Sequence, residues 1–369
     1  MAGIYIHIPF CKQACHYCNF HFSTSLRQKN ELVVALLKEI ELRLNELENE
    51  KIETIYFGGG TPSLLQIEDL QLQIEKIFSL FLVSKDAEVT LETNPDDITE
   101  KNLEGWKEIG ITRLSIGIQS FFEEDLQWMN RAHTSEQAID NLQLAKQYFD
   151  NITIDLIYGT PLLTNEKWKQ NVDTAISYKI PHLSCYALTV EPKTPLQKMI
   201  SLHKTDDVNP DKQSEQFLLL MQWLEETGYE HYEISNFAKP GFRSRHNSSY
   251  WQGKNYLGIG PSAHSLNGSS RQWNISNNNQ YIESIRNGII PFEKEVLTPT
   301  QQLNEYIMTS LRTIEGLDLD KVGEVAGSKL KTAGKRYIES GLMKVEDQFL
   351  QLTKEGKLLA DGIAAALFS

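Results

Sequence analysis

The chain has 369 residues, of which 40% are hydrophobic and 23% are charged, and its formal net charge at pH 7 is −13. This composition is typical of a globular protein of about two or three domains, and no stretch approaches the roughly 18 apolar residues that a membrane span requires. The acidic balance argues against a nucleic-acid binder, because such affinity comes largely from basic residues, and the N-terminus lacks the features of a secretory signal, so we expect a cytoplasmic protein.

The first two thirds of the chain repeat one unit, a short β-branched or alternating segment followed by a turn and an amphipathic helical stretch. Alternation of strands and helices indicates a parallel sheet with right-handed crossovers. Six successive units favour a partly closed barrel over an open sheet, and in both arrangements the loops that follow the strands gather on one face and build the site. The predicted strands are Ile4–Ile8, Thr54–Phe57, Glu88–Thr93, Arg113–Ile118, Ile152–Ile157 and Leu183–Thr189.

The pattern changes after residue 200. A long helix is predicted at about Asp211–Thr227, followed by short strands and turns through Asn278. From about Leu297 the pattern predicts three helices, a hairpin near Leu342–Leu352 and a last helix from Lys354, which we interpret as a small winged-helix-like domain. We therefore divide the chain into a barrel (1–200), a barrel extension (201–296) and a C-terminal domain (297–369).

Three of the four cysteines, Cys11, Cys15 and Cys18, lie together just after the first predicted strand. Disulfides among them would close only tiny loops and leave one thiol over, so in a reducing compartment the spacing indicates a metal site. Three thiolates suit an iron-sulfur cubane in which one iron stays open to another ligand. A zinc site completed by His16 or His21, and buried free thiols, are the alternatives.

A run of three glycines, Gly58 to Gly60 in GGGTPS, ends the second predicted strand. Glycine permits positive φ and a close approach of the backbone to a ligand. Together with the CX3CX2C spacing, this loop resembles the radical SAM superfamily, in which it binds the methionine amino group of S-adenosylmethionine (SAM). The resemblance implies an α/β fold built on a partial (β/α)6 barrel, and a 4Fe-4S cluster on Cys11, Cys15 and Cys18 with SAM at its open iron.

Six segments extend the resemblance to oxygen-independent coproporphyrinogen III oxidase and its relatives: YIHIPFCKQACHYC, YFGGGTPS, LETNP, IGIQSF, NRAH and DLIYGTP. Their shared chemistry implies reductive cleavage of SAM to methionine and a 5′-deoxyadenosyl radical, and an electron donor to the cluster. By motif, Tyr5 and His7 lie beside the cluster. The implied SAM-binding residues are Tyr5, Gly59, Gly60, Thr61, Glu92, Gln119, Arg131, Asp155 and Ala187.

Two features depart from the oxidase pattern, in which a fourth cysteine stands where this chain has Phe20 and a longer segment precedes the first strand. The segment RHNSSYW, residues 245–251, together with the CNF ending of the cysteine motif, resembles instead the HemW-type heme chaperones. This resemblance implies heme bound within the barrel extension, with His246 as the candidate axial ligand and the adjacent aromatic residues packed on the macrocycle.

Three hypotheses follow. The first is a heme chaperone that passes heme to an acceptor protein, and the second is an enzyme, either coproporphyrinogen III oxidase or another radical SAM enzyme. The third is a zinc-dependent structural or DNA-binding protein. Whether SAM cleavage belongs to the function stays open at this point, as does the oligomeric state, with a homodimer among the alternatives.

Overall fold

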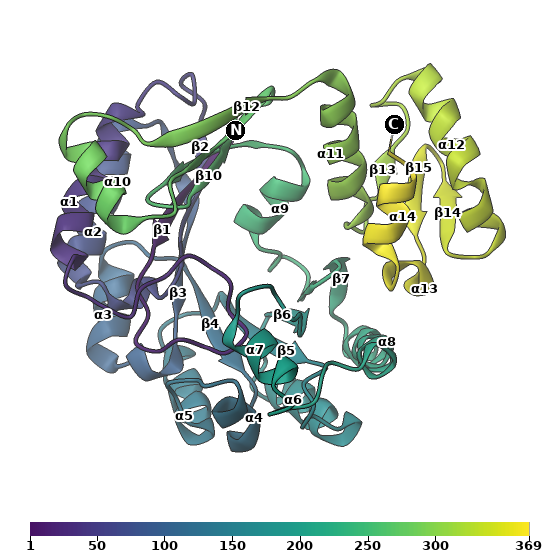
Figure 1. Ribbon diagram of the computed structural model, residues 1–369, viewed down its shortest axis with the longest axis horizontal. Helices are drawn as coiled ribbons and strands as arrows, with labels where there is room; N and C mark the ends of the chain where they lie inside the picture. Colours follow the sequence, from purple (N-terminus) through teal and green to yellow (C-terminus); the bar gives the residue numbers. More distant parts are fainter. Residues whose placement is uncertain (369) are drawn as a thin grey trace.

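The computed structural model describes residues 1–368, and the six predicted strands form the centre of its main sheet (Figure 1). They run parallel to one another and are paired in sequence order. Each predicted strand is therefore confirmed, with ends that differ by a few residues. The strands are β1 (Ala2–Ile8), β2 (Ile52–Gly59), β3 (Val83–Thr93), β4 (Arg113–Gln119), β5 (Ile152–Tyr158) and β6 (His182–Ala187).

The two faces of this sheet differ in polarity. On β1, the fully buried Ile4, Ile6 and Ile8 belong to the main apolar core, whereas Tyr5 and His7 point to the opposite face, since successive side chains of a strand alternate. The helices between the strands lie along the outer face of the sheet (Figure 1), and Tyr5 and His7 are on its other face. These helices are α1 (Lys29–Leu42), α2 (Ile67–Leu80), α3 (Glu100–Glu108), α4 (Glu123–Trp128), α5 (Ser135–Ala145) and α6 (Asn165–Ser177).

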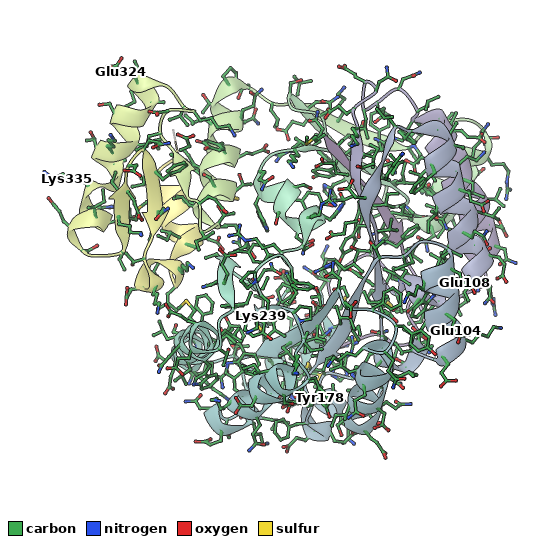
Figure 2. All side chains as sticks on the ribbon, turned by 180° about the vertical axis from the view of Figure 1, so that it is seen from behind. Glu104, Glu108, Tyr178, Lys239, Glu324 and Lys335 are labelled. Atoms are coloured by element: carbon green, nitrogen blue, oxygen red, sulfur yellow. The ribbon has the colours of Figure 1, made fainter. Side chains whose placement is uncertain are left out.

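Helix α3 shows how these helices sit on the sheet. Its Leu103 and Trp106 are buried, while Glu104 and Glu108 point away from the sheet (Figure 2). An apolar stripe at helical spacing thus packs on the sheet, and the charged side faces solvent. The Thr99 side chain caps the helix by accepting a hydrogen bond from the Asn102 N–H.

Residues after 200 extend the sheet at both edges. The predicted long helix is confirmed as α8 (Pro210–Glu226), and β9 returns to pair in parallel with β1. The sheet then has the order β12-β11-β10-β9-β1-β2-β3-β4-β5-β6-β8-β7, and within residues 1–368 its end strands do not pair with each other. Within these residues the sheet therefore does not close on itself, which confirms a partial rather than a closed barrel. The other elements here are α7 (Pro195–Ser201), β7 (Glu230–Glu233), β8 (Asn236–Ala238), α9 (Arg245–Trp251), β9 (Asn255–Ile259), β10 (His264–Leu266), β11 (Ser270–Asn274), α10 (Asn278–Arg286) and β12 (Phe292–Val296).

The C-terminal residues form a small unit with its own apolar core and a three-stranded antiparallel sheet. The predicted hairpin is confirmed as β14 and β15, but the prediction of three helices before it is wrong. Two helices occur there, because Leu317 and Asp318 pair with β15 as a short strand instead of continuing a helix. The last predicted helix is divided into two. The elements are α11 (Pro299–Leu311), β13 (Leu317–Asp318), α12 (Glu324–Glu339), β14 (Met343–Glu346), β15 (Phe349–Leu352), α13 (Lys354–Lys357) and α14 (Ala360–Ala366).

Figure 1 shows this C-terminal unit, coloured from green to yellow, on the side of the molecule where α9 and β7 lie. In the part of the chain that the structure describes, no helix is both long and apolar enough to cross a membrane.

Candidate functional site

A cavity of about 920 Å³ lies where the core strands end. Its predicted lining residues are up to 176 positions apart in the sequence, from Cys11 to Ala187, and they come together because the carboxyl ends of parallel strands meet at one edge of a sheet. Tyr5 and His246 are not among the residues that line it. The predicted site residues that line it are Cys11, Cys15, Cys18, Gly59, Gly60, Thr61, Glu92, Gln119, Arg131, Asp155 and Ala187.

The cysteine loop between β1 and α1 is held in place by residues that the sequence did not single out. Lys12 forms an ion pair with Asp96 at 2.7 Å. Gln13 donates to the Asn130 side chain at 2.8 Å, and Asn130 in turn donates to the carbonyl of Ala14 at 2.7 Å. Asn130 has a φ of +57°, which is uncommon outside glycine. The NRAH motif, which begins at Asn130, marked this residue in the sequence. Nothing in the motif predicted that Asn130 holds the cysteine loop in place.

The donor set of the loop fits an iron-sulfur cluster. Cys11, Cys15 and Cys18 are free thiols that are partly exposed to the cavity, and burial raises the pKa of Cys11 to about 11, so binding to iron must displace its proton. In residues 1–368, no three His, Cys, Asp or Glu side chains converge as ligands of one metal ion. A cubane does not require such convergence, because each of its three cysteines binds a different iron.

The histidines of the zinc alternative are engaged elsewhere. His16 Nδ1 lies 2.8 Å from the carbonyl oxygen of Trp128, and His21 Nε2 lies 2.7 Å from the Asn278 side-chain oxygen. Both histidines therefore help to fix the loop, and the geometry favours the cluster over a zinc site completed by either of them.

The glycine loop packs directly against the strand that leads to the cysteines. Gly59 has a φ of +106°, and a Cβ atom placed there would lie 2.5 Å from the His7 ring. A Cβ atom on Gly60 would lie 2.6 Å from the carbonyl oxygen of Phe10. Only glycine fits either position, and the loop presents its backbone to the cavity, as a backbone-bound ligand requires.

Two carboxyl groups, Glu92 on β3 and Asp155 on β5, face the cavity. Glu92 accepts hydrogen bonds from the Tyr56 hydroxyl at 2.8 Å and from the Gly59 N–H at 3.1 Å. Burial raises the pKa of Glu92 to about 7 and that of Asp155 to about 6. A cationic ligand would stabilise the charged form of both groups, so the cavity is suited to a ligand with an ammonium or sulfonium group.

Gln119 and Arg131 close the same side of the cavity. Gln119 ends β4 at a register irregularity with a φ of +67°, a strained conformation of the kind found at functional sites. Arg131 donates to the Asn94 side chain at 2.6 Å and to the carbonyl of Gly117 at 2.8 Å, and its Nη1 lies 3.4 Å from Cys15 Sγ. Its buried Nε has no hydrogen-bond partner among the described residues and could donate to a ligand carboxylate.

His246 lies beneath the cavity and is 1% exposed. Its Nδ1 lies 2.7 Å from the Thr54 hydroxyl, its Nε2 lies 2.8 Å from the Tyr250 hydroxyl, and its ring stacks on Tyr56 with 4.9 Å between centroids. Burial lowers the pKa of His246 to about 3, so the ring is neutral. Both ring nitrogens of His246, the residue predicted as the axial heme ligand, therefore have partners in this structure, because α9 packs against β1 and β2.

Tyr5 belongs to the same layer as His246. Its ring stacks on Tyr56 and His246 at 6.0 and 6.4 Å, and its hydroxyl lies 3.2 Å from His7 Nδ1. Tyr5 therefore supports the floor of the cavity, one layer below the residues that line it.

The cavity continues toward the C-terminal unit, which the sequence did not predict. Its lining there includes Arg312 after α11 and Lys357 in α13. The Arg312 guanidinium also lies over the ring of Trp251, the last residue of α9, at 5.1 Å from the centroid. Through Trp251, the segment 245–251 thus contacts a residue that lines the cavity.

Comparison with protein-family models matches residues 5–175 to the Radical SAM superfamily and residues 297–359 to the HemN C-terminal domain. The Heme chaperone HemW of Bacillus subtilis is 32% identical over 374 aligned positions, which cover 99% of this chain and 99% of the relative. The protein of the same name from Mycobacterium tuberculosis is 31% identical, over 99% of this chain and 94% of the relative.

A solved structure shares the complete architecture. Coproporphyrinogen III oxidase HemN of Escherichia coli, a radical SAM enzyme, superimposes with a TM-score of 0.85 and 23% identity over 100% of this chain and 90% of the other. This structural similarity confirms the fold, and at 23% identity it supports a conclusion about the fold alone.

Proposed function

Since the chain belongs to the radical SAM superfamily and, within it, to the family of the HemW heme chaperones, we propose that it binds heme and passes it to an acceptor protein. The observation that carries this proposal is the extent of the similarity, which spans 99% of this chain and 99% of the Bacillus subtilis relative. The cavity supports it, because it continues from the cysteine loop to the C-terminal unit and, at about 920 Å³, is large for a ligand cavity.

We propose that Cys11, Cys15 and Cys18 hold a 4Fe-4S cluster whose open iron binds SAM. When bound, these cofactors supply reductive cleavage of SAM at its sulfonium, for which an electron-donor protein is required. The chain's own residues orient SAM. Glu92 accepts from its ammonium group, the Arg131 Nε–H pairs with its carboxylate, and the glycine loop presents its backbone. Because free thiolates need a reducing compartment, we place the protein in the cytoplasm.

His246 is the proposed axial ligand of heme, and the structure sets a condition on this role. Ligation requires α9 to move, because Nδ1 and Nε2 are occupied by Thr54 and Tyr250. Helix α9 has only seven residues, and the indole N–H of Trp251 at its end has no hydrogen-bond partner within residues 1–368. These features support a segment that can rearrange when heme arrives.

The second candidate function is oxidative decarboxylation of coproporphyrinogen III, since the same cofactor residues and cavity would serve a radical enzyme. Phe20 is the residue that separates the two candidates. Its side chain is 67% exposed and lines the cavity mouth, at the position where the oxidase pattern has a cysteine.

One preparation tests both candidates. The protein is purified without oxygen, its cluster is reconstituted, and heme titration and coproporphyrinogen III turnover are measured on the same sample. We expect stoichiometric heme binding without turnover, and transfer of bound heme to an apo-hemoprotein. Robust production of protoporphyrinogen would overturn the chaperone proposal, and failure to bind iron after reconstitution would overturn the cofactor assignment.

His246→Ala tests the ligand in the same titration, with Tyr250→Phe as the matched variant that frees one ring nitrogen but keeps the histidine. Loss of the absorption spectrum of histidine-ligated heme in His246→Ala, with that spectrum kept in Tyr250→Phe, supports His246. An unchanged spectrum in His246→Ala removes this residue from the proposal.

A further inference from the structure

Lys357 stands out among the residues at the C-terminal end of the cavity. Lys357 lines the cavity, and its ammonium group donates a hydrogen bond to His231 Nδ1 at 2.9 Å. His231 Nε2 lies 3.0 Å from the carbonyl oxygen of Ile234 and must donate to it, so Nδ1 carries no hydrogen and accepts from Lys357. The histidine is thus a neutral partner.

The positive charge of Lys357 has no direct carboxylate partner among the described residues. The other cation at this end, Arg312, is bonded to Glu233 at 3.1 Å and to Asp361 at 2.8 Å. The second oxygen of Glu233 accepts from the N–H of Ser235 and from the Asn236 side chain. Glu233 is therefore fully engaged.

A partly buried ammonium group without a counter-charge is costly, and a charged ligand of opposite sign relieves that cost. Burial lowers the pKa of Lys357 to about 8, which is the expected sign of this cost. An anionic group of a ligand in the cavity would therefore gain an ion pair with Lys357.

Aromatic side chains adjoin this charge. Phe217 packs edge-on against the His231 ring at 5.8 Å, and Tyr158 stacks on Phe217 at 6.2 Å. Tyr158, Phe217 and Lys357 all line the cavity. This end of the cavity therefore offers flat apolar surfaces next to one unpaired cation, which suits a planar apolar ligand with a carboxylate at its edge.

We propose that Lys357 is a carboxylate-binding residue of the cavity that receives a propionate of a tetrapyrrole. This inference rests on the proposed function and deepens it, because it fixes which end of the ligand faces the C-terminal unit. Neither the cysteine loop nor residues 245–251 supply this contact.

The test compares the binding of iron(III) protoporphyrin IX with that of its dimethyl ester, in which both carboxylates are blocked, in one detergent-containing buffer. Lys357→Gln should weaken binding of the free acid by about tenfold to a hundredfold, the range of a charge-assisted hydrogen bond, and leave binding of the ester unchanged. Lys357→Arg should restore most of the affinity for the acid. The matched control is Lys354→Gln, one turn away on the exposed side of α13, which should alter neither ligand.

The outcomes separate this inference from the proposed function. If wild-type protein binds neither ligand, the heme proposal itself fails. If Lys357→Gln binds the free acid as wild type does, or loses acid and ester equally, Lys357 only fastens α13 to β7 through His231, and the inference is overturned. Thermal unfolding of each variant shows whether an equal loss comes from a damaged fold.

Discussion

Replacing Glu92 with glutamine tests whether the charge of this buried carboxyl group lowers the free energy of unfolding. Burial raises the pKa of Glu92 from an ordinary value of 4.5 to about 7. Between these two values the folded state binds the proton more tightly than the unfolded state. The resulting stabilisation is therefore fully present below about pH 4.5 and is lost as the pH rises through about 7.

The magnitude follows from this pKa difference. At about 1.4 kcal/mol per pKa unit, full conversion gives about 3 kcal/mol. Glu92 faces a cavity that water can enter, which screens its charge, so we expect a smaller effect of about 1 to 2 kcal/mol. Glutamine has the shape of the protonated carboxyl group. Its oxygen can accept from the Gly59 N–H while its nitrogen donates to the Tyr56 hydroxyl, so neither hydrogen bond is lost.

The assay is urea unfolding of the metal-free protein at about pH 5 and about pH 8, for wild type and Glu92→Gln. The free energy of unfolding of the variant, relative to wild type, should rise by about 1 to 2 kcal/mol between the two pH values. After cluster reconstitution, the same variant should bind SAM more weakly, because it has lost the charge that the ammonium group pairs with. Glu75→Gln, on the exposed side of α2, is the matched control. A stability difference that does not change with pH would refute the reasoning.

Three further predictions address the rest of the site. Replacing Cys11, Cys15 or Cys18 with serine should abolish the visible absorption of the reconstituted cluster, while Cys185→Ser, a buried cysteine of β6, should keep it; retained iron in all three variants would contradict the ligand set. Gly59→Ala should lower the free energy of unfolding by more than Gly253→Ala does, because a Cβ at Gly59 meets the His7 ring whereas a Cβ at Gly253 has no neighbour within 4 Å in the described chain and incurs only the positive-φ strain of about 1 kcal/mol; equal losses would refute the packing argument. His246→Ala should destabilise the protein by about 2 to 4 kcal/mol, because it leaves buried hydroxyls of Thr54 and Tyr250 without their partner, and the exposed His264→Ala should have little effect; urea unfolding measures both.

The core of the fold could be predicted because each of its strands is apolar, β-branched and followed by a helical pattern. The edge strands could not be predicted from such a pattern. All five residues of β12, FEKEV, are at least partly exposed, so no buried face marks them as a strand. Similarly, β13 is only two residues long and exists because β15, more than 30 positions later, pairs with it. Pairing of this kind depends on tertiary structure and leaves little trace in a local pattern.

The residues of the site also fall into those that could be predicted from the sequence and those that could not. Residues that belong to continuous motifs, such as Gly59 and Arg131, could be placed by resemblance, and the cavity brings them together. Lys12 and Lys357 could not, since an isolated lysine is usually a solvated surface residue. Their roles arise from partners far away in the sequence, Asp96 for Lys12 and His231 for Lys357.

The position of His246 bears on how its variants must be interpreted. Its ring stacks on Tyr56, the Tyr56 hydroxyl donates to Glu92, and Glu92 accepts from the Gly59 backbone, so a continuous set of contacts joins α9 to the proposed SAM site. If heme draws His246 away from Thr54 and Tyr250, Tyr56 loses its stacking partner and the hydrogen bond that holds Glu92 is weakened. A loss of heme binding in His246→Ala could then reflect either a missing ligand or a disturbed cavity floor. Only the first cause leaves SAM affinity unchanged, so SAM binding has to be measured on the same variant before His246 is assigned as a ligand.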